Sequence, residues 1–388
     1  MAESKIKAAV AKDLSSTPFA CSSLTQLSGG TANFLYRGVL SQPLPDGTST
    51  IIVKHAEDYL ASNADFKLSA ERCLVEEFAL RALDGMRSVT TTHEGSIAGP
   101  GPGSSKDGQR YQITVKTPKL FHFSRPTHTQ VMEDLPSAVD LKTFMRTPGV
   151  AGSISKEWTL SIGRTLGAWL RSFHFWVGEP AQEGVASRFA GFTDMRDLKF
   201  AINYDGILNK IDVYPEILGE SREVFEKVRE AAKGELEGDG HLIGPIHGNF
   251  WSGNVLIPKS ALDEPVPVTP LFITDWELAQ RGSRALDLGQ MIAELYMLKH
   301  FKDIDAGVWV IEGFAEGYKD INEDIAFRTI IHVGVHFIFW GSTIPGWGTE
   351  EQVRDLVKLG RDLITMAWER ERGWFRGSVW EVLFRARH

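Results

Sequence analysis

The hydrophobic pattern of the sequence changes near residue 135. Before this point, short runs of β-branched and aromatic residues alternate with turn residues, as in segments 24–40 and 48–56, and predict strands. After it, apolar residues recur at helical spacing over long segments such as 155–177 and 215–236. We therefore predict an α+β fold with two lobes. The first, 1–134, is small and β-rich and binds a nucleotide; the second, 135–388, is larger and mainly helical and binds an acceptor.

Each lobe is expected to contain some of the other type of element. In the first lobe, segment 69–86 has helical periodicity, with Cys73, Glu76, Leu80 and Leu83 on one stripe. A stretch rich in glycine, proline and serine, 95–108, is expected to be a flexible loop between two strands. In the second lobe, two short strands are expected at 254–258 and 270–276.

Composition limits the possible functions. The chain has 388 residues, is 43% hydrophobic and 24% charged, and carries a formal net charge of −8. This acidic balance disfavours binding to nucleic acid or to an anionic membrane. Cys21 and Cys73 are its two cysteines, the first residues contain no apolar signal segment, and we expect no membrane span. These features predict a cytoplasmic protein with a small-molecule partner; they do not predict its oligomeric state.

The segment HGNFWSGN, residues 247–254, has the spacing of a phosphotransferase catalytic loop. Asn254 follows Asn249 by five residues, the separation between a catalytic acid and a metal ligand in protein-kinase-like enzymes. Gly248 and Gly253 would permit the tight backbone that such a loop needs. Asp275, at the end of an apolar strand, supplies a carboxylate that could hold magnesium together with Asn254.

Lys54 is the candidate phosphate-binding residue of the first lobe. It lies in the strand segment IIVKH and is either a solvent-facing lysine of an edge strand or the lysine that meets the α- and β-phosphates. Glu76 lies on the apolar stripe of the following helix, where an unpaired carboxylate is costly, so Lys54 is its expected partner. Glu77 is the competing choice but points off that stripe. The Gly29–Gly30 turn could bring backbone close to phosphate.

The segments HGNFWSGNVL, ITDWELAQRGSRALDLG, IIVKHA and MEDL resemble the aminoglycoside phosphotransferase and choline kinase superfamily. Within it, the chain looks most similar to the methylthioribose kinase and fungal 4-hydroxytryptamine kinase branch, through IIVKHAEDYLASNADFK, the pair Glu71–Arg72, and WGTEEQVRDLVKLG. The resemblance spans most of the chain. It implies a bilobal protein-kinase-like fold and a small-molecule kinase that uses ATP and Mg²⁺ to phosphorylate a hydroxyl group.

The resemblance also implies roles for individual residues. ATP would lie between the lobes; Asn254 and Asp275 would bind magnesium. His247 would hold the loop backbone, Asn249 would occupy the catalytic-base position, and Asp287 would support the loop. The expected nucleotide-binding residues are Gly29, Gly30, Asn33, Lys54, Glu76 and the hinge residues Met132, Glu133 and Leu135.

Asn249 is the departure from the superfamily, which almost always has aspartate there. An amide is no base, and losing a positioned base costs about 10²–10⁴ in rate. Three interpretations stay open: a deliberate Asp-to-Asn change that traps a bound molecule, a natural pseudokinase, or an enzyme that uses the cleft for other chemistry. A protein kinase is disfavoured, since the loop reads H-G-N and no A-P-E segment follows.

The acceptor site is predicted from aromatic residues and one carboxylate. Trp251, Trp340 and Trp347 are the candidates, although aromatic clusters in helices more often form core. Glu277 is a nearby carboxylate that could assist a metal or the acceptor, or face solvent. His174 is expected to be a buried, hydrogen-bonded histidine. The resemblance points to a thiosugar or a hydroxylated amine or alcohol as acceptor.

Overall fold

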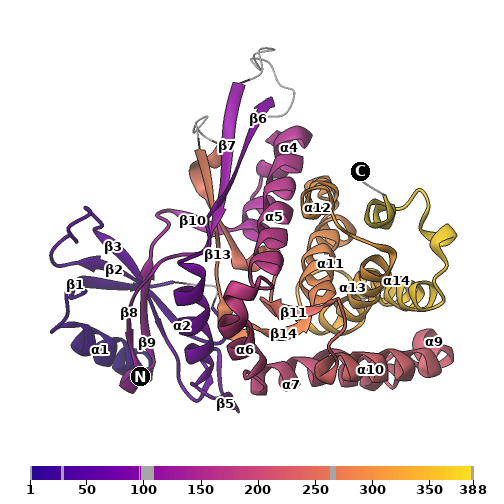
Figure 1. Ribbon diagram of the computed structural model, residues 1–388, viewed down its shortest axis with the longest axis horizontal. Coiled ribbons are helices and arrows are strands. Elements are labelled where there is room, and N and C mark those ends of the chain that lie inside the picture. The colour runs from indigo at the N-terminus through magenta and orange to yellow at the C-terminus, as the bar shows by residue number, and fades with distance from the viewer. Residues whose placement is uncertain (1, 28–29, 96, 98–108, 263–267, 386–388) are drawn as a thin grey trace. The chain divides into compact units, whose positions relative to one another are not determined.

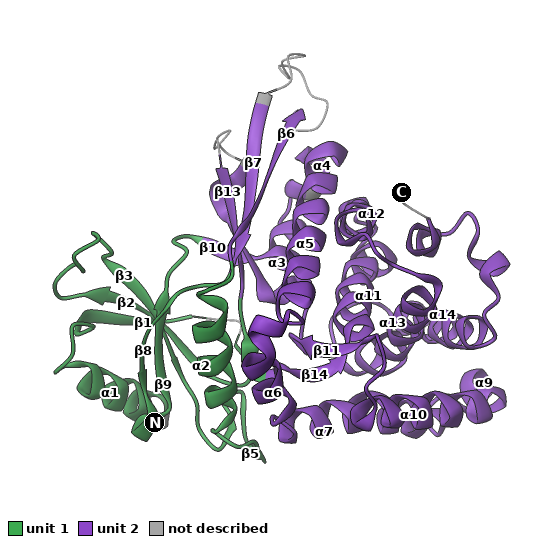
Figure 2. Cartoon of the chain, in the orientation of Figure 1, with its two compact units in different colours: residues 1–86, 117–137, 274–277 green, residues 87–116, 138–273, 278–388 purple. Residues whose placement is uncertain are grey.

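The computed structural model describes residues 2–27, 30–95, 97, 109–262 and 268–385. Its chain divides into two compact units, shown in Figure 2. Unit 1 comprises residues 1–86, 117–137 and 274–277, and unit 2 comprises 87–116, 138–273 and 278–388. The two units are defined by their internal contacts and not by what they bind. The division into a nucleotide-binding lobe, 1–134, and an acceptor-binding lobe, 135–388, therefore stays a prediction.

Unit 1 is built on a five-stranded antiparallel sheet in the order β1-β2-β3-β9-β8 (Figure 1). The strands are β1 (Cys21–Gln26), β2 (Phe34–Leu40), β3 (Thr50–His55), β8 (Leu120–Ser124) and β9 (Thr129–Glu133). A helix that we did not predict, α1 (Ala2–Leu14), adds Ile6, Val10 and Leu14 to the core of this sheet. These three residues recur every four positions and so line one face of the helix.

The predicted helix of unit 1 is present as α2 (Arg72–Leu83), and all four residues of its stripe are buried. A short hairpin, β4 (Tyr59–Leu60) and β5 (Asn63–Lys67), precedes it. The β3 strand lies between β2 and β9, in the middle of the sheet. A side chain on β3 is therefore held by strands on both sides.

Unit 2 contains a second five-stranded sheet, in the order β10-β12-β13-β7-β6. Its β13–β7 pair is parallel and its other pairs are antiparallel. A two-stranded sheet pairs β11 with β14, and β11 ends directly before the predicted catalytic loop. Most of the predicted flexible loop, 95–108, lies outside the described residues. The strands are β6 (Val89–Gly95), β7 (Gln109–Lys116), β10 (Ala138–Asp140), β11 (Ile243–Ile246), β12 (Val255–Pro258), β13 (Val268–Ile273) and β14 (Gln280–Ser283).

The rest of unit 2 is mainly helical, as predicted. Segment 215–236, expected to be one helix, is instead divided by a 3₁₀ turn at Gly219–Ser221, because glycine and serine are weaker helix formers than the residues around them. A π-helix, Ala201–Asp205, joins α7 to α8. The helices are α3 (Leu141–Arg146), α4 (Val150–Ser153), α5 (Lys156–Trp176), α6 (Glu183–Ala190), α7 (Asp194–Phe200), α8 (Gly206–Ile211), α9 (Pro215–Leu218), α10 (Arg222–Glu237), α11 (Arg284–Lys302), α12 (Asp305–Tyr318), α13 (Glu323–Thr343) and α14 (Glu350–Trp368).

Helix α13 is the one helix in the described ranges that is long and apolar enough to cross a membrane. Its most apolar 18-residue window is 78% buried inside the structure. Core helices of soluble proteins have the same length and composition, so α13 is weak evidence for a membrane span.

Helices α5 and α12 meet along four glycines, Gly163 and Gly167 on one helix and Gly313 and Gly317 on the other. A Cβ atom added to Gly167 would lie 2.1 Å from the carbonyl oxygen of Phe314, and one added to Gly317 would lie 1.9 Å from that of Arg164. Figure 1 shows the two helices side by side. We call this contact the glycine seam; its backbones touch without intervening side chains.

The glycine seam predicts an unusual effect of alanine. Gly317→Ala should destabilise the chain by about 1–3 kcal/mol, because the added methyl group overlaps a fixed backbone oxygen. Gly234→Ala, within α10 where nothing lies within 4 Å of the added Cβ, should stabilise it by about 0.5–1 kcal/mol through better helix propensity. Urea unfolding of both variants measures the difference. Equal stabilisation by the two substitutions would contradict the backbone contact.

Candidate active site

Lys54 is the centre of a buried charge cluster in unit 1. Its Nζ atom lies 2.7 Å from Glu76 Oε2 and 2.7 Å from Asp275 Oδ1, and 3.7 Å from Glu277 Oε2. The ion pair with Glu76 is the one expected from the sequence. The alternative of a solvent-facing lysine on an edge strand is wrong, since Lys54 is 6% exposed on a central strand.

The carboxylates keep Lys54 charged. Burial alone would lower the pKa of Lys54, but the charges of Asp275, Glu76 and Glu277 outweigh burial and raise that pKa above its ordinary value. Burial raises the pKa of Glu277, and the nearby charge of Lys54 opposes this. The cluster therefore holds a permanent ammonium group among acidic side chains.

Glu277 also joins the cluster to the predicted nucleotide loop. Asn33 Nδ2 donates to Glu277 Oε2 over 2.7 Å, and Arg72 Nη2 donates to Asn33 Oδ1 over 2.9 Å. Arg72 Nε lies 3.4 Å from Glu277, and its other nitrogens donate to backbone carbonyls. Glu277 is 3% exposed, so the solvent-facing alternative is wrong. Arg72 was noted in the resemblance alone; its position as the link between these residues was not predicted.

Asp275 has a backbone conformation that is rare for a residue with a side chain. It follows β13 by two residues and has a φ of +68°, in the left-handed region. The next residue, Trp276, donates its N–H to Glu76 Oε1 over 3.2 Å. Strained residues of this kind are held by their surroundings and cluster at functional sites. Here the strain directs the carboxylate to Lys54.

The other predicted nucleotide-binding residues are distributed over unit 1. Gly29 lies outside the described residues, and a Cβ on Gly30 would lie 2.9 Å from Leu35 Cδ1. Met132 and Leu135 are buried, and Glu133 is half-buried. Between them, Asp134 forms a two-bond ion pair with Arg37, with distances of 2.9 and 3.0 Å, which we did not predict. This pair fixes the end of β9 to β2.

In unit 2, the loop after β11 is held by one buried carboxylate. Asp287, in the first turn of α11, accepts the N–H groups of His247 and Gly248 over 2.8 and 2.9 Å. His174 Nε2 lies 3.2 Å from the same carboxylate, and its Nδ1 lies 2.9 Å from the Tyr318 hydroxyl. The prediction that His174 is a buried, hydrogen-bonded histidine is confirmed, and burial lowers its pKa.

Gly248 allows the loop to approach Leu278, the last residue of the 3₁₀ turn Trp276–Leu278, just before β14. Its φ is +75°, and a Cβ there would lie 2.1 Å from the carbonyl oxygen of Leu278. His247 Nδ1 accepts the N–H of Asn249 over 3.2 Å, so His247 holds the loop backbone as expected. The conformation of the loop is thus set by its own backbone and by Asp287.

The amide oxygen of Asn249 accepts two hydrogen bonds. Gln290 Nε2 donates to it over 2.8 Å and Lys199 Nζ over 3.3 Å, while Lys199 also donates to Gln290 Oε1 over 3.2 Å. Asn254 Nδ2 donates to the backbone oxygen of Asn249 over 3.0 Å, which ties the two ends of the loop together. Lys199 and Gln290 were not predicted, because nothing in their local sequences resembles a site.

The chain shares nearly its full length with known phosphotransferases. It is 32% identical over 98% of its length, and 97% of the relative's, to the phosphotransferase FrzJ of a Cladobotryum species. It belongs to the family of this phosphotransferase. It is also 24% identical to the 4-hydroxytryptamine kinase of Psilocybe cyanescens, over 92% of this chain and 90% of that protein. The predicted superfamily placement and the α+β protein-kinase-like fold class are confirmed.

Two further comparisons add little detail. No protein-family model matches the chain. A solved choline/ethanolamine kinase family protein from Mesorhizobium loti aligns with 97% of each chain, at 14% identity and a TM-score of 0.46.

The side chains available in this small-molecule phosphotransferase suit magnesium held together with phosphate. Within the described ranges, no group of three or more His, Cys, Asp or Glu side chains is arranged to hold a metal alone. Magnesium in such enzymes is usually bound by one or two protein ligands plus substrate phosphates. Asp275 and Asn254 provide oxygen donors, and the cluster around Lys54 contains more acids than bases. The residues therefore fit the ion.

The three predicted acceptor tryptophans fall into two groups within unit 2. Lys142 Nζ lies 4.2 Å from the ring centre of Trp251 and 5.5 Å from that of Trp347, so these two rings share one cation. Trp340 donates its indole N–H to Asn203 over 3.1 Å, and Lys199 Nζ lies 5.8 Å from its ring centre. Of the three predicted acceptor tryptophans, Trp340 is therefore the one beside Lys199.

A carboxylate lies one helical turn beyond Gln290 on α11. Glu294 Oε1 lies 3.0 Å from His336 Nε2. Its other oxygen, Oε2, is buried and has no hydrogen-bond partner among the residues that the structure describes. The His336 ring lies beside Trp340, with 6.4 Å between ring centres. An unmatched carboxylate oxygen thus lies near the residues around Asn249.

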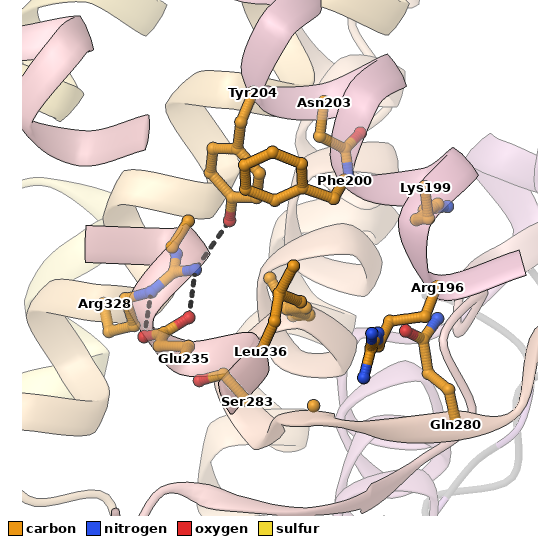
Figure 3. A pocket seen from close by; sticks show the side chains of 13 residues that line it. Arg196, Lys199, Phe200, Asn203, Tyr204, Glu235, Leu236, Gln280, Ser283 and Arg328 are labelled. Atoms are coloured by element: carbon orange, nitrogen blue, oxygen red, sulfur yellow. Dashed lines mark hydrogen bonds and ion pairs between the residues drawn. The ribbon is translucent and has the colours of Figure 1, made fainter. Parts of the chain in front are cut away.

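Lys199 also lines a small pocket, together with Tyr204, Glu235 and Arg328 (Figure 3). Arg328 donates to both oxygens of Glu235 over 2.7 Å and to the Tyr204 hydroxyl over 2.6 Å. Burial raises the pKa of Tyr204 to about 12. His332 Nδ1 lies 3.2 Å from the same hydroxyl, and burial, followed by the charge of Arg328, lowers the pKa of His332 well below its ordinary value.

The lowered pKa of His332 predicts loss of stability in acid. In the unfolded chain a histidine takes up a proton below about pH 6.5, whereas His332 in the folded chain stays neutral. The unfolded state therefore gains relative stability as pH falls, by about 1.4 kcal/mol per pH unit for one such group. Urea unfolding between about pH 7.5 and about pH 5.5 should show a smaller loss for His332→Gln than for the parent. His241→Gln, at an exposed position, should match the parent; equal slopes in all three would refute the assignment.

Proposed function

We propose that the chain is an ATP- and magnesium-dependent kinase that phosphorylates a hydroxyl group of a small metabolite. The observation that supports this most directly is Lys54, held at 2.7 Å from both Glu76 and Asp275. Phosphoryl transfer depends on positioning and charge neutralisation, and this arrangement provides a fixed cation beside a candidate metal ligand. Cys21 and Cys73 are free thiols, which is compatible with the cytoplasmic location that we propose.

In this proposal the residues expected from the sequence take the following roles. Lys54 binds the α- and β-phosphates, and Glu76 orients it. Gly29, Gly30 and Asn33 bind the phosphates, and Met132, Glu133 and Leu135 contact the base of the nucleotide. Asp275 and Asn254 hold magnesium, which when bound neutralises charge on the transferred phosphate. Asp287 holds the loop that presents residue 249 to the acceptor.

Asn249 limits the proposed activity. Its amide oxygen accepts bonds from Gln290 and Lys199, but an amide cannot take a proton from a hydroxyl group. Aspartate is nearly the same size, and its carboxylate would accept the same two bonds and pair with the ammonium of Lys199. The surroundings of residue 249 therefore suit a carboxylate, which favours a kinase impaired by one substitution.

Restoring the carboxylate should restore transfer. Asn249→Asp is expected to raise kcat by about 10²–10⁴, because a positioned base contributes that much to such reactions. ATP consumption with magnesium and a pooled panel of hydroxyl compounds measures the effect, and Asn63→Asp, at an exposed position, is the matched control. Inactivity of both variants with every acceptor would instead favour a pseudokinase or different chemistry in the same site.

We further propose that the acceptor is a hydroxylated amine. The unmatched, buried oxygen of Glu294 would bind an ammonium group, and the ring of Trp340, which lies beside the His336 ring that contacts Glu294, would add a cation–π contact. Two relatives are named for a hydroxylated amine, 4-hydroxytryptamine. Gln290, which donates to Asn249, lies one turn from Glu294 on the same helix. This separation suits a small molecule that carries a hydroxyl group near Asn249 and an amine near Glu294.

Removing the charge of Glu294 should weaken amine binding alone. In the Asn249→Asp background, Glu294→Gln is expected to raise KM for amine acceptors by about 10- to 100-fold, the worth of one charge-assisted hydrogen bond. Hydroxyl acceptors without an amine serve as the internal control, and Glu226→Gln tests a glutamate at an exposed position. An equal change for both acceptor types would exclude Glu294 as the amine-binding group.

A further inference from the structure

Lys199 is a buried lysine that touches the residue at the catalytic-base position. It lies on α7 and is 8% exposed. Its ammonium group donates to the side-chain oxygens of Asn249 and Gln290, over 3.3 and 3.2 Å. A lysine is rarely buried to this degree, because its charge loses hydration on burial. The position of Lys199 therefore requires a reason.

Support of Asn249 alone is an insufficient reason. Gln290 already donates to Asn249 Oδ1 over 2.8 Å, a shorter contact than that of Lys199. A neutral side chain could fill the remaining space without the cost of desolvating a charge. What Lys199 adds to this position is positive charge, which would pair with a carboxylate at residue 249 and would also act on an anion bound beside that residue.

The place of Asn249 in the loop indicates where that charge would act. In the proposed reaction, the side chain at this position lies within hydrogen-bond reach of the acceptor hydroxyl, and the hydroxyl oxygen lies about 3–3.5 Å from the attacked phosphorus. A cation in contact with Asn249 Oδ1 is thus one contact away from the oxygens of the transferred phosphoryl group. Negative charge on those oxygens is what such an enzyme must neutralise.

The ammonium group is also held in a defined place. Gln290 and Asp287 are three residues apart on α11, so one face of one helix fixes both Lys199 and the backbone of the loop. On the other side, α7 continues directly into the π-helix that contains Asn203, which binds Trp340. π-Helices are rare and occur frequently at functional sites.

We propose that Lys199 is a catalytic residue whose ammonium group binds the phosphoryl group during transfer. The inference rests on the proposed kinase function. The acceptor oxygen forms a bond to the γ-phosphorus, and the bond from that phosphorus to the β,γ-bridging oxygen breaks with its electron pair left on ADP. The hydroxyl proton leaves to water in the Asn249 chain and to residue 249 in Asn249→Asp. Lys199 stays protonated throughout and stabilises the charge on the phosphoryl oxygens.

The first test measures binding and so does not depend on turnover. The full-length parent chain and Lys199→Met are titrated with magnesium and ADP, and then with magnesium, ADP and aluminium fluoride, which mimics the phosphoryl group in transfer. Lys199→Met should weaken binding of the fluoride complex by about 10- to 100-fold and leave ADP affinity within about twofold, because it removes one charge-assisted bond. Lys199→Arg, which keeps the charge, should retain part of the affinity.

The matched control is Lys210→Met. Lys210 lies on α8 in the same helical run, is partly buried, and packs over Phe339, with Nζ 5.7 Å from the ring centre. The Lys210→Met variant should bind magnesium–ADP and magnesium–ADP–aluminium fluoride with the affinities of the parent chain. Thermal unfolding of each variant identifies any that does not fold, and Lys199→Arg then provides the comparison for the fluoride complex.

The second test uses turnover in the Asn249→Asp background. Lys199→Met should lower kcat by about 10²–10³ with acceptor KM little changed, as expected for a group that acts in the transition state. If Lys199→Met binds the fluoride complex as tightly as the parent, or loses ADP and the fluoride complex equally, the role of Lys199 is refuted while the kinase function stands. A parent chain that binds neither complex would overturn the kinase function, and this inference with it.

Discussion

The ammonium group of Lys54 is the interaction on which the organisation of unit 1 depends. Glu76 comes from a helix, and Asp275 and Glu277 come from the segment after β13, about two hundred residues further along the chain. All three approach one nitrogen atom. Buried carboxylates of like charge repel one another unless a cation lies among them. Lys54 therefore allows segment 274–277 to belong to this unit. The same segment contains the candidate magnesium ligand.

Much of this arrangement could be predicted from the sequence, and the reasons are local. Lys54 lies in an apolar strand and Glu76 on an apolar stripe, so each side chain needed a partner of opposite charge. The sequence therefore predicted that the two would form an ion pair. The loop from His247 to Asn254 has a fixed spacing, and its glycine at 248 has the positive φ that the turn requires. A residue whose role follows from its own neighbours in sequence can be recognised without a structure.

The residues that were missed depend on tertiary contacts. Lys199, Gln290 and Glu294 lie on helices whose sequences contain no unusual spacing. Lys199 on α7 and Gln290 on α11 meet at Asn249, and Glu294, one turn beyond Gln290, contacts His336 instead. Arg37 and Asp134 are another example, since their pairing follows from the order of the strands. Helix α1 was missed because its three core residues form a narrow stripe within a polar segment.

The glycine seam has a consequence for the loop at a distance. His174 belongs to α5 and Tyr318 to α12, and together they hold the carboxylate of Asp287. At the four glycines α5 and α12 touch through backbone atoms, so no layer of side chains separates them there and one helix cannot easily slide past the other. A slip of one residue would rotate Tyr318 by about 100° around its helix axis and away from His174. The glycine seam thus fixes the register of the two helices. Through the hydrogen bonds from Tyr318 to His174, from His174 to Asp287 and from Gly248 to Asp287, this register also determines the position of the loop.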